Sequence, residues 1–273
     1  MRKKTYGSPG GKGRIWELDF IRGVCILLMV LDHILYDLAY VFWGSWFPGG
    51  EGEGLWYSLC LFAREFYFPW TLRTLVRYLV VFLFLFICGI SCSLSRSNLK
   101  RGLRLAAVAL LLTLATWGMD RFLGQEDVFI IRWGVLHMLA ASILLYCLLG
   151  RLGPRFLTVL GLLAAAAGIW TMFHALEVSA DWPDYFLYST GRIYSADYFP
   201  LLPWAGFFLL GTVFGRRFYK SKKSLLPGVA YGGILRPALF AGRYALWFYL
   251  LHQPLVFIFL TAAGVFVTGE LPY

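Results

Sequence analysis

Seven stretches of the 273-residue chain are apolar over about the length that a lipid bilayer demands. A transmembrane helix needs roughly 20 predominantly apolar residues. Only 15% of the residues are charged and 59% are hydrophobic, whereas a soluble domain carries about 25% charged residues. The sequence therefore predicts an all-α polytopic membrane protein, a bundle of about seven transmembrane helices. These helices are expected at residues 16–43, 74–95, 103–119, 133–150, 155–174, 199–216 and 239–267.

The rest of the chain completes a simple domain plan. Residues 1–14 are basic and Gly-rich and are predicted to form a cytoplasmic tail, followed by a single transmembrane domain over residues 15–273. No small-residue cleavage site follows the first apolar stretch, so this stretch is expected to remain as the first helix. Residues 55–70 are aromatic but contain charges and a proline, which favours an interfacial or re-entrant segment.

The charged loops predict the orientation of the helices. Basic residues gather in the tail and in alternate loops around residues 96–104, 151–155 and 216–236, while acidic residues gather in the loops between. By the positive-inside rule the N-terminus is cytoplasmic and the C-terminus lies outside. The net charge of +10 is thus mainly a topology signal and does not indicate nucleic acid binding. The basic loops can attract membrane lipid headgroups or a phosphate-bearing co-substrate.

The first predicted helix carries five ionisable residues at membrane depth, which is costly and typical of a functional site. They are Asp19, Arg22, Asp32, His33 and Asp37. At 100° per residue, His33 and Asp37 share a face and Asp32 points about 100° away. A carboxylate one turn from an imidazole can orient it and stabilise its protonated form, so we expect a His33–Asp37 pair. The alternative is that the charges only join neighbouring helices.

Other polar side chains are expected at compatible depths. His252 and Gln253 precede Pro254 in the last apolar stretch, about as far from the cytoplasmic side as His33. They are predicted to face a substrate or an oxyanion, or else to satisfy the backbone groups that a proline frees in a helix. Candidates nearer the outer side are His137, Arg132, Asp197 and Trp204. Five cysteines lie among apolar residues without the pattern of a zinc site, so no metal is expected.

An ordered set of motifs resembles one known family. The motifs are ELDFIRGVCILLMVLDH, FLFLFICGIS, RWGVLHML, DYFPLLPWAGFFLLG and GRYALWFYLLHQP. In this order they resemble bacterial relatives of heparan-α-glucosaminide N-acetyltransferase, in the transmembrane acyltransferase superfamily. The resemblance extends from Arg14 to Pro254.

The resemblance implies an acetyl-CoA-dependent acetyltransferase of the bacterial cytoplasmic membrane. It implies transfer from cytosolic acetyl-CoA to an amine or hydroxyl of an extracytoplasmic sugar or glycan. The family's lysosomal enzyme uses a histidine in the loop after its first helix, but the matching loop here, residues 44–57, has none. We therefore assign His33 as general base, as in the wider superfamily, with Asp37 as its partner. An acetyl-histidine intermediate is the alternative within this mechanism.

The resemblance also implies sites for the other parts of the reaction. Donors to the tetrahedral oxyanion are expected from His252, Gln253 or Trp204. Cations for the phosphates of CoA are expected from Arg22, Arg96, Lys100 and Arg101. Small-residue helix faces permit a homodimer.

Two other functions fit the same residues. Ionisable groups at mid-membrane also serve transporters of protons, small anions or sugar-linked substrates, although the two halves of the chain show no inverted repeat. A structural or sensory membrane protein with buried polar contacts is the third hypothesis. Binding of CoA or acetyl-CoA discriminates the enzyme from both.

Overall fold

The computed structural model describes residues 14–174, 182–188, 194–227 and 233–268. The predicted cytoplasmic tail therefore lies outside the described residues, apart from Arg14. Within these ranges the regular structure is helical, and one isolated bridge between Trp133 and Tyr198 is the only strand-like pairing. The prediction of an all-α fold is confirmed.

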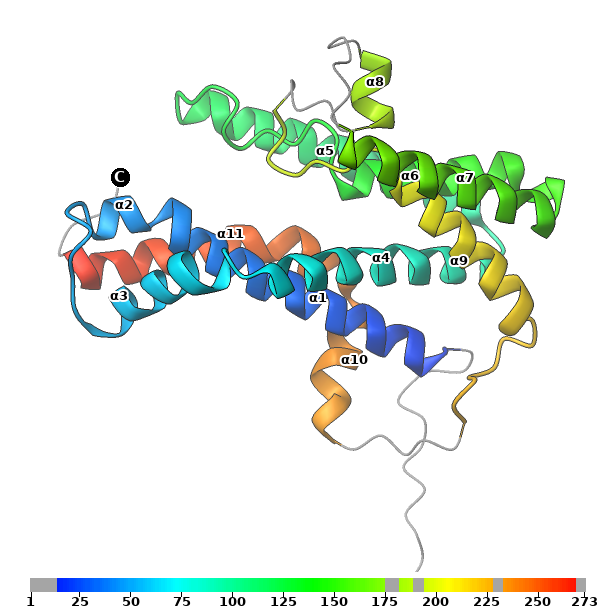
Figure 1. Ribbon diagram of the computed structural model, residues 1–273, viewed down its shortest axis with the longest axis horizontal. Coiled ribbons are helices and arrows are strands. Elements are labelled where there is room, and N and C mark those ends of the chain that lie inside the picture. Colours follow the sequence, from blue (N-terminus) through cyan, green and yellow to red (C-terminus); the bar gives the residue numbers. More distant parts are fainter. Residues whose placement is uncertain (1–13, 175–181, 189–193, 228–232, 269–273) are drawn as a thin grey trace, which may run out of the picture. The chain divides into compact units, whose positions relative to one another are not determined.

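Contacts divide the chain into two units, whose helices are labelled in Figure 1. Unit 1 combines the residues up to Phe84 with those from Leu226 onward, and unit 2 comprises Leu85–Leu225. Unit 1 contains α1 (Trp16–Tyr36), the π-helix η1 (Asp37–Val41), α2 (Trp43–Trp46), α3 (Gly54–Leu61), the π-helix η2 (Phe62–Tyr67), the start of α4 (Thr71–Leu94), the 3₁₀ turn η4 (Gly233–Leu235), α10 (Arg236–Arg243) and α11 (Ala245–Thr268). Unit 2 contains the rest of α4, α5 (Asn98–Phe122), α6 (Val135–Leu149), the 3₁₀ turn η3 (Gly150–Leu152), α7 (Pro154–Phe173), α8 (Trp182–Leu187) and α9 (Trp204–Phe218).

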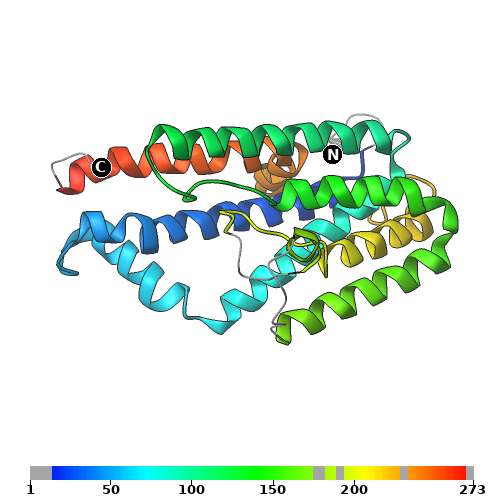
Figure 2. The same ribbon diagram turned by 90° about the horizontal axis from the view of Figure 1, so that it is seen from above.

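In unit 1 the central pair of helices is α1 and α11, which are far apart in sequence. They run side by side in the same direction, as the blue and red ribbons of Figures 1 and 2 show. α11 contains Pro254 within the helix, and α1 changes to π geometry at Asp37. Both irregularities therefore fall in the half of each helix that bears its histidine. π-segments inside helices are rare and frequent at functional sites.

The short helix α10 packs closely against the first half of α1. A side chain on Gly23 would collide with the backbone carbonyl of Ala238, and one on Gly242 would collide with the carbonyl of Asp19. Small residues allow helix backbones to approach in this way within a membrane. The contact positions the start of α1, including Asp19 and Arg22.

Beyond the histidines, unit 1 is filled by an aromatic and aliphatic core. Phe42, Trp46, Cys60 and Leu260 are buried in one cluster that joins η1, α2, α3 and α11. The stretch 55–70 forms α3 and η2 and then turns into α4. The two π-helices η1 and η2 contact each other, so this short segment is packed against the end of α1.

Unit 2 is held together by two pairs of antiparallel helices, α5 with α6 and α7 with α9 (Figure 2). Glycines mark the closest approaches: Gly102 faces Leu144, while Gly161 and Gly206 bring the α7 and α9 backbones together. These helices are apolar on their exposed faces; Leu111, Leu148 and Leu163 are each more than 60% exposed. Such exposure suits a lipid surrounding, in which apolar side chains need no protein cover.

Within the described part of the chain, six helices are long and apolar enough to cross a membrane: α1 with η1, α4, α5, α6 with η3, α7 and α11. The seventh predicted span, residues 199–216, corresponds to α9, which begins only at Trp204 and has 15 residues. It is shorter because Pro203 precedes the helix and residues 199–203 are not helical. A total of about seven spans remains consistent with the fold.

Candidate active site

Two histidines meet in unit 1 at the contact between α1 and α11. The rings of His33 and His252 lie edge to face, with centroids 4.9 Å apart and planes inclined by 76°. Both side chains are partly buried. The similar depths expected from counting along the two helices thus correspond to direct ring contact.

Each ring is fixed through its Nδ1 atom. His33 Nδ1 lies 2.8 Å from the Met29 carbonyl oxygen, and His252 Nδ1 lies 2.8 Å from the carbonyl oxygen of Tyr249. A carbonyl can only accept, so Nδ1 carries the hydrogen in both rings and Nε2 of a neutral ring keeps its lone pair. The Nε2 atom of His252 is buried and has no hydrogen-bond partner among the residues that the structure describes. The site therefore offers imidazole nitrogens that can take up a proton.

Asp37 does not form the predicted hydrogen bond with His33. Its carboxylate, 1% exposed, accepts two hydrogen bonds of 3.0 and 2.9 Å from Nε2 of Gln253. The Met29 carbonyl, one turn before His33, already occupies the Nδ1 that Asp37 would have oriented. The structure therefore corrects the direct pairing, and links Asp37 to α11 instead.

Gln253 connects the two helices and presents a second unused acceptor. Because its amide nitrogen donates to Asp37, its Oε1 must point elsewhere. This oxygen is buried, and no described residue donates a hydrogen bond to it. In their neutral forms, His252 Nε2 and Gln253 Oε1 accept hydrogen bonds and do not donate them. This corrects the expectation that these two groups serve as oxyanion donors.

A second polar cluster adjoins His33 and was missed in the sequence. Arg73 of α4 binds both carboxylate oxygens of Asp32, at 2.8 and 2.6 Å, and the Tyr67 hydroxyl donates to the same carboxylate at 3.0 Å. The Arg73 guanidinium also lies 4.5 Å from the ring centroid of Phe68. The available signal was a pair of opposite charges in adjoining apolar stretches, but their depths could not be compared across the turn at residues 68–70.

At the start of α1, Arg22 is bound by the protein itself. Its Nη1 donates to Asp19 at 3.0 Å and to the Gly242 carbonyl at 3.4 Å. Asp19 also pairs with Arg14 at 2.9 Å, and this hydrogen bond raises the pKa of the Arg14 guanidinium. Arg22 therefore ties α1 to α10, which agrees with the alternative expectation that the charges of the first helix join neighbouring helices, while its binding of CoA stays a prediction.

The predicted CoA-binding cations of unit 2 lie on the short turn between α4 and α5 and at the start of α5. Arg96, Lys100 and Arg101 are all exposed. The structure shows no hydrogen bond or ion pair from their side chains to another described residue. They are accessible to an anionic ligand.

His137, also in unit 2, acts as a helix cap. Its Nδ1 accepts from the Gly134 N–H at 3.2 Å, so its Nε2 carries the hydrogen and faces the Thr113 hydroxyl at 3.1 Å. Thr113 in turn donates to the Ile131 carbonyl at 2.6 Å. Nδ1 thus caps the start of α6, and Nε2 joins α6 to α5.

The remaining predicted substrate residues support the same loop region. Asp197 accepts from the Val135 N–H at the start of α6, at 2.9 Å. Arg132 donates to Asp127 at 2.7 Å and to the Tyr194 carbonyl at 2.6 Å. Trp204 is buried at the first position of α9, against Phe199. A direct contact of these side chains with substrate stays a prediction.

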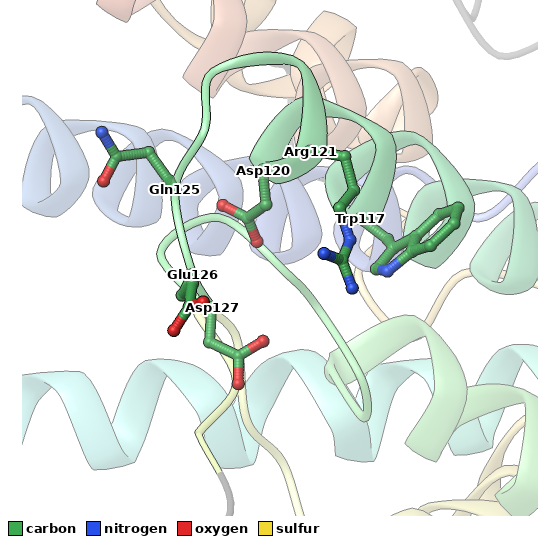
Figure 3. Close-up of a pocket in the computed structure, with 6 residues that line it drawn as sticks. All are labelled: Trp117, Asp120, Arg121, Gln125, Glu126 and Asp127. Atoms are coloured by element: carbon green, nitrogen blue, oxygen red, sulfur yellow. The ribbon is translucent and has the colours of Figure 1, made fainter.

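A small pocket at the end of α5 lies within this loop region (Figure 3). Asp120 lies in its wall and accepts hydrogen bonds from the N–H groups of Val128, Phe129 and Ile130, at 3.2, 2.8 and 3.0 Å. The volume of the pocket is about 160 Å³. The pocket is lined by Trp117, Asp120, Arg121, Gln125, Glu126 and Asp127. Asp120 fixes the loop that follows α5, which explains a buried carboxylate at this place.

Helices of membrane-spanning length, with ionisable side chains in contact between them, define an integral membrane protein that carries a polar site within its spans. A family model described as heparan-alpha-glucosaminide N-acetyltransferase, catalytic, matches residues 14–68 and 59–254. The chain belongs to this family, and with it to the membrane acyltransferases. No curated protein and no solved structure gave a significant match. Among the described residues, no group of three or more His, Cys, Asp or Glu side chains is placed to hold a metal ion.

Proposed function

We propose that the protein transfers an acetyl group from acetyl-CoA to an amine or hydroxyl of an extracytoplasmic sugar or glycan. Family membership supports the acyl transfer. The observation that carries the proposal is the contact between His33 and His252, in which both rings are fixed through Nδ1 and keep Nε2 for proton transfer. A proton acceptor at membrane depth is what such a reaction requires.

In the proposed reaction, His33 is the general base. Its Nε2 takes the proton from the acceptor nitrogen or oxygen, which attacks the thioester carbonyl carbon of acetyl-CoA. The carbon–sulfur bond then breaks, and the CoA thiolate leaves and takes the proton back from His33. General base catalysis of this kind contributes about 10²–10⁴-fold to the rate.

The neighbouring side chains receive separate roles in this proposal. His252 Nε2 and Gln253 Oε1 accept hydrogen bonds from other hydroxyl or amide groups of the acceptor sugar, which satisfies two buried atoms that have no partner among the described residues. Asp37 holds Gln253 in place by accepting hydrogen bonds from its amide nitrogen. Arg96, Lys100 and Arg101 are proposed to bind the phosphates of CoA, since exposed cations that no described residue pairs with suit anions.

The proposal is tested by acetyl transfer from radiolabelled acetyl-CoA to a panel of amino sugars and neutral sugars, with purified protein in lipid nanodiscs. We expect His33→Ala to lower kcat by about 10²–10⁴-fold and to retain the thermal stabilisation by acetyl-CoA. The matched control is His174→Ala: this histidine is exposed at the end of α7 and stacks on Trp170.

Two results would contradict the proposal. One is a wild-type protein that is neither stabilised by acetyl-CoA nor able to consume it. The other is a His33→Ala variant with the activity of the wild type, which would remove the base from the mechanism while leaving the family assignment intact.

A further inference from the structure

Asp32, Arg73 and Tyr67 form a largely buried polar cluster in unit 1. The ion pair is bidentate, and the side chains of Arg73 and Asp32 are only 13% and 23% exposed. Charged groups within a bilayer are expensive and tend to be functional. A well-packed apolar pair often stabilises a fold as well as a buried ion pair does. Stability alone therefore does not account for these charges.

The position of the cluster points to a more specific task. Asp32 immediately precedes His33 in the last α-helical turns of α1, and π geometry begins at Asp37. Two side chains of this segment are held from different elements. Asp32 is bound by the η2–α4 turn through Tyr67 and Arg73, and Asp37 is bound by Gln253 of α11. His33 lies between these two attachments.

We propose that Asp32, Arg73 and Tyr67 are positioning residues, which fix the rotation of α1 about its axis and so direct His33 toward His252. Asp32 lies about 100° around the helix from His33, so a carboxylate held at two oxygens sets the direction of the next side chain. Arginine suits this task because its planar guanidinium matches a carboxylate in one orientation. The inference rests on the proposed function, because it concerns the base of that reaction.

The size of the expected effect follows from helix geometry. Side chains extend about 5–6 Å from the axis of an α-helix, so a rotation of 10° displaces the His33 ring by about 1 Å. A misplacement of about 1 Å can cost as much as 10²-fold in rate. We therefore expect kcat to fall by about 10–100-fold when the restraint is removed and the fold is kept.

The test uses a double variant that removes both charges together. Asp32→Asn/Arg73→Gln leaves no unpaired charge in the membrane, so it is expected to fold more readily than either single variant. We expect it to lower kcat by about 10–100-fold while the KM values for acetyl-CoA and the acceptor stay within about twofold of the wild type. Arg77→Gln is the matched control, since Arg77 is exposed one turn further along α4 and forms no ion pair with another described residue.

Two milder variants keep the test independent of folding. Tyr67→Phe loses one hydrogen bond to Asp32, and Arg73→Lys keeps the charge but loses the bidentate geometry. We expect both to lower kcat by several-fold without changing either KM. Loss of acetyl-CoA binding in these variants would contradict a positioning role.

The outcomes separate this inference from the proposed function. If wild-type protein transfers acetyl groups, His33→Ala does not, and the double variant keeps kcat within twofold, the cluster is only scaffold and the inference is overturned. If the wild type does not transfer acetyl groups at all, the proposed function is overturned, and the positioning role that rests on it is overturned with it.

Discussion

The polar side chains of unit 1 meet across a large separation in the sequence. Asp37 and Gln253 are 216 residues apart in the chain, yet the carboxylate of the first depends on the amide of the second. The burial of Asp37 makes this dependence strong, because a buried charged group that loses its hydrogen-bond donor loses at least about 1–3 kcal/mol of stability.

The exchange Gln253→Leu should therefore destabilise the protein by about 1–3 kcal/mol. The measurement is the midpoint of thermal unfolding in detergent. In the Gln253→Leu background, Asp37→Leu should recover part of the loss, since it removes the unpaired carboxylate. An unchanged midpoint for Gln253→Leu would show that water or lipid replaces the amide.

Counting along the predicted helices was sufficient to place His33 and His252 at similar depths. It could not show that Asp37 turns to Gln253, because that depends on the onset of π geometry, which no local sequence pattern announces. The role of His137 could not be predicted either, and the sequence favoured a functional group within the membrane. The sequence shows an ionisable residue in an apolar stretch, while its hydrogen bonds to Gly134 and Thr113 exist only in the folded unit.

At the scale of elements, the contact between α1 and α10 is the most sensitive to change. The α1 position Gly23 faces the Ala238 carbonyl and the Gly242 backbone at close range, and neither can move without displacing a helix. The expected effects of glycine substitutions therefore differ sharply between helices.

We expect Gly23→Ala to reduce the yield of folded protein and to lower its unfolding temperature, because the added methyl collides with backbone. The matched control is Gly118→Ala in α5, where the space is open and alanine favours the helix by about 0.5–1 kcal/mol. Size-exclusion profiles and thermal unfolding compare the two variants. Equal behaviour of both would contradict the close packing of α1 and α10.

Helix existence was predictable from length and hydropathy, but helix ends were not. The stretch 199–216 reads as one apolar span, whereas α9 starts at Trp204 because the preceding residues take hydrogen bonds with α8 and the loop after α5. In the same way, residues 55–70 show aromatic character without a clear period. The pairing of η2 with η1 decides their structure, and that is a tertiary effect.

At the scale of the whole molecule, the path of the chain through the membrane remains a prediction. The alternation of basic and acidic loops predicts that the two termini lie on opposite sides, which requires an odd number of crossings. Seven crossings result only if α9 also spans the membrane. α9 is about 22 Å long at 1.5 Å per residue, which is shorter than the bilayer core of about 30 Å. The single domain predicted over residues 15–273 likewise stays a prediction, beside a contact pattern that forms two units.

Reporter fusions decide the topology. A phosphatase that requires the extracytoplasmic side should be active when fused after α11 and inactive when inserted in the basic turn at residues 96–101. A fluorescent protein that folds in the cytoplasm should give the opposite pattern. If both positions report the same side, α9 does not cross, and the count of six crossings holds.

The contact between α1 and α11 also has a consequence for biosynthesis. Membrane proteins are inserted while the ribosome still elongates them, so α1 enters the bilayer long before α11 has been translated. Until then His33 lacks its neighbouring ring and Asp37 lacks its amide donor. During that interval the carboxylate of Asp37 has no amide donor from α11, and the contact between α1 and α11 is incomplete until the last helix has been synthesised.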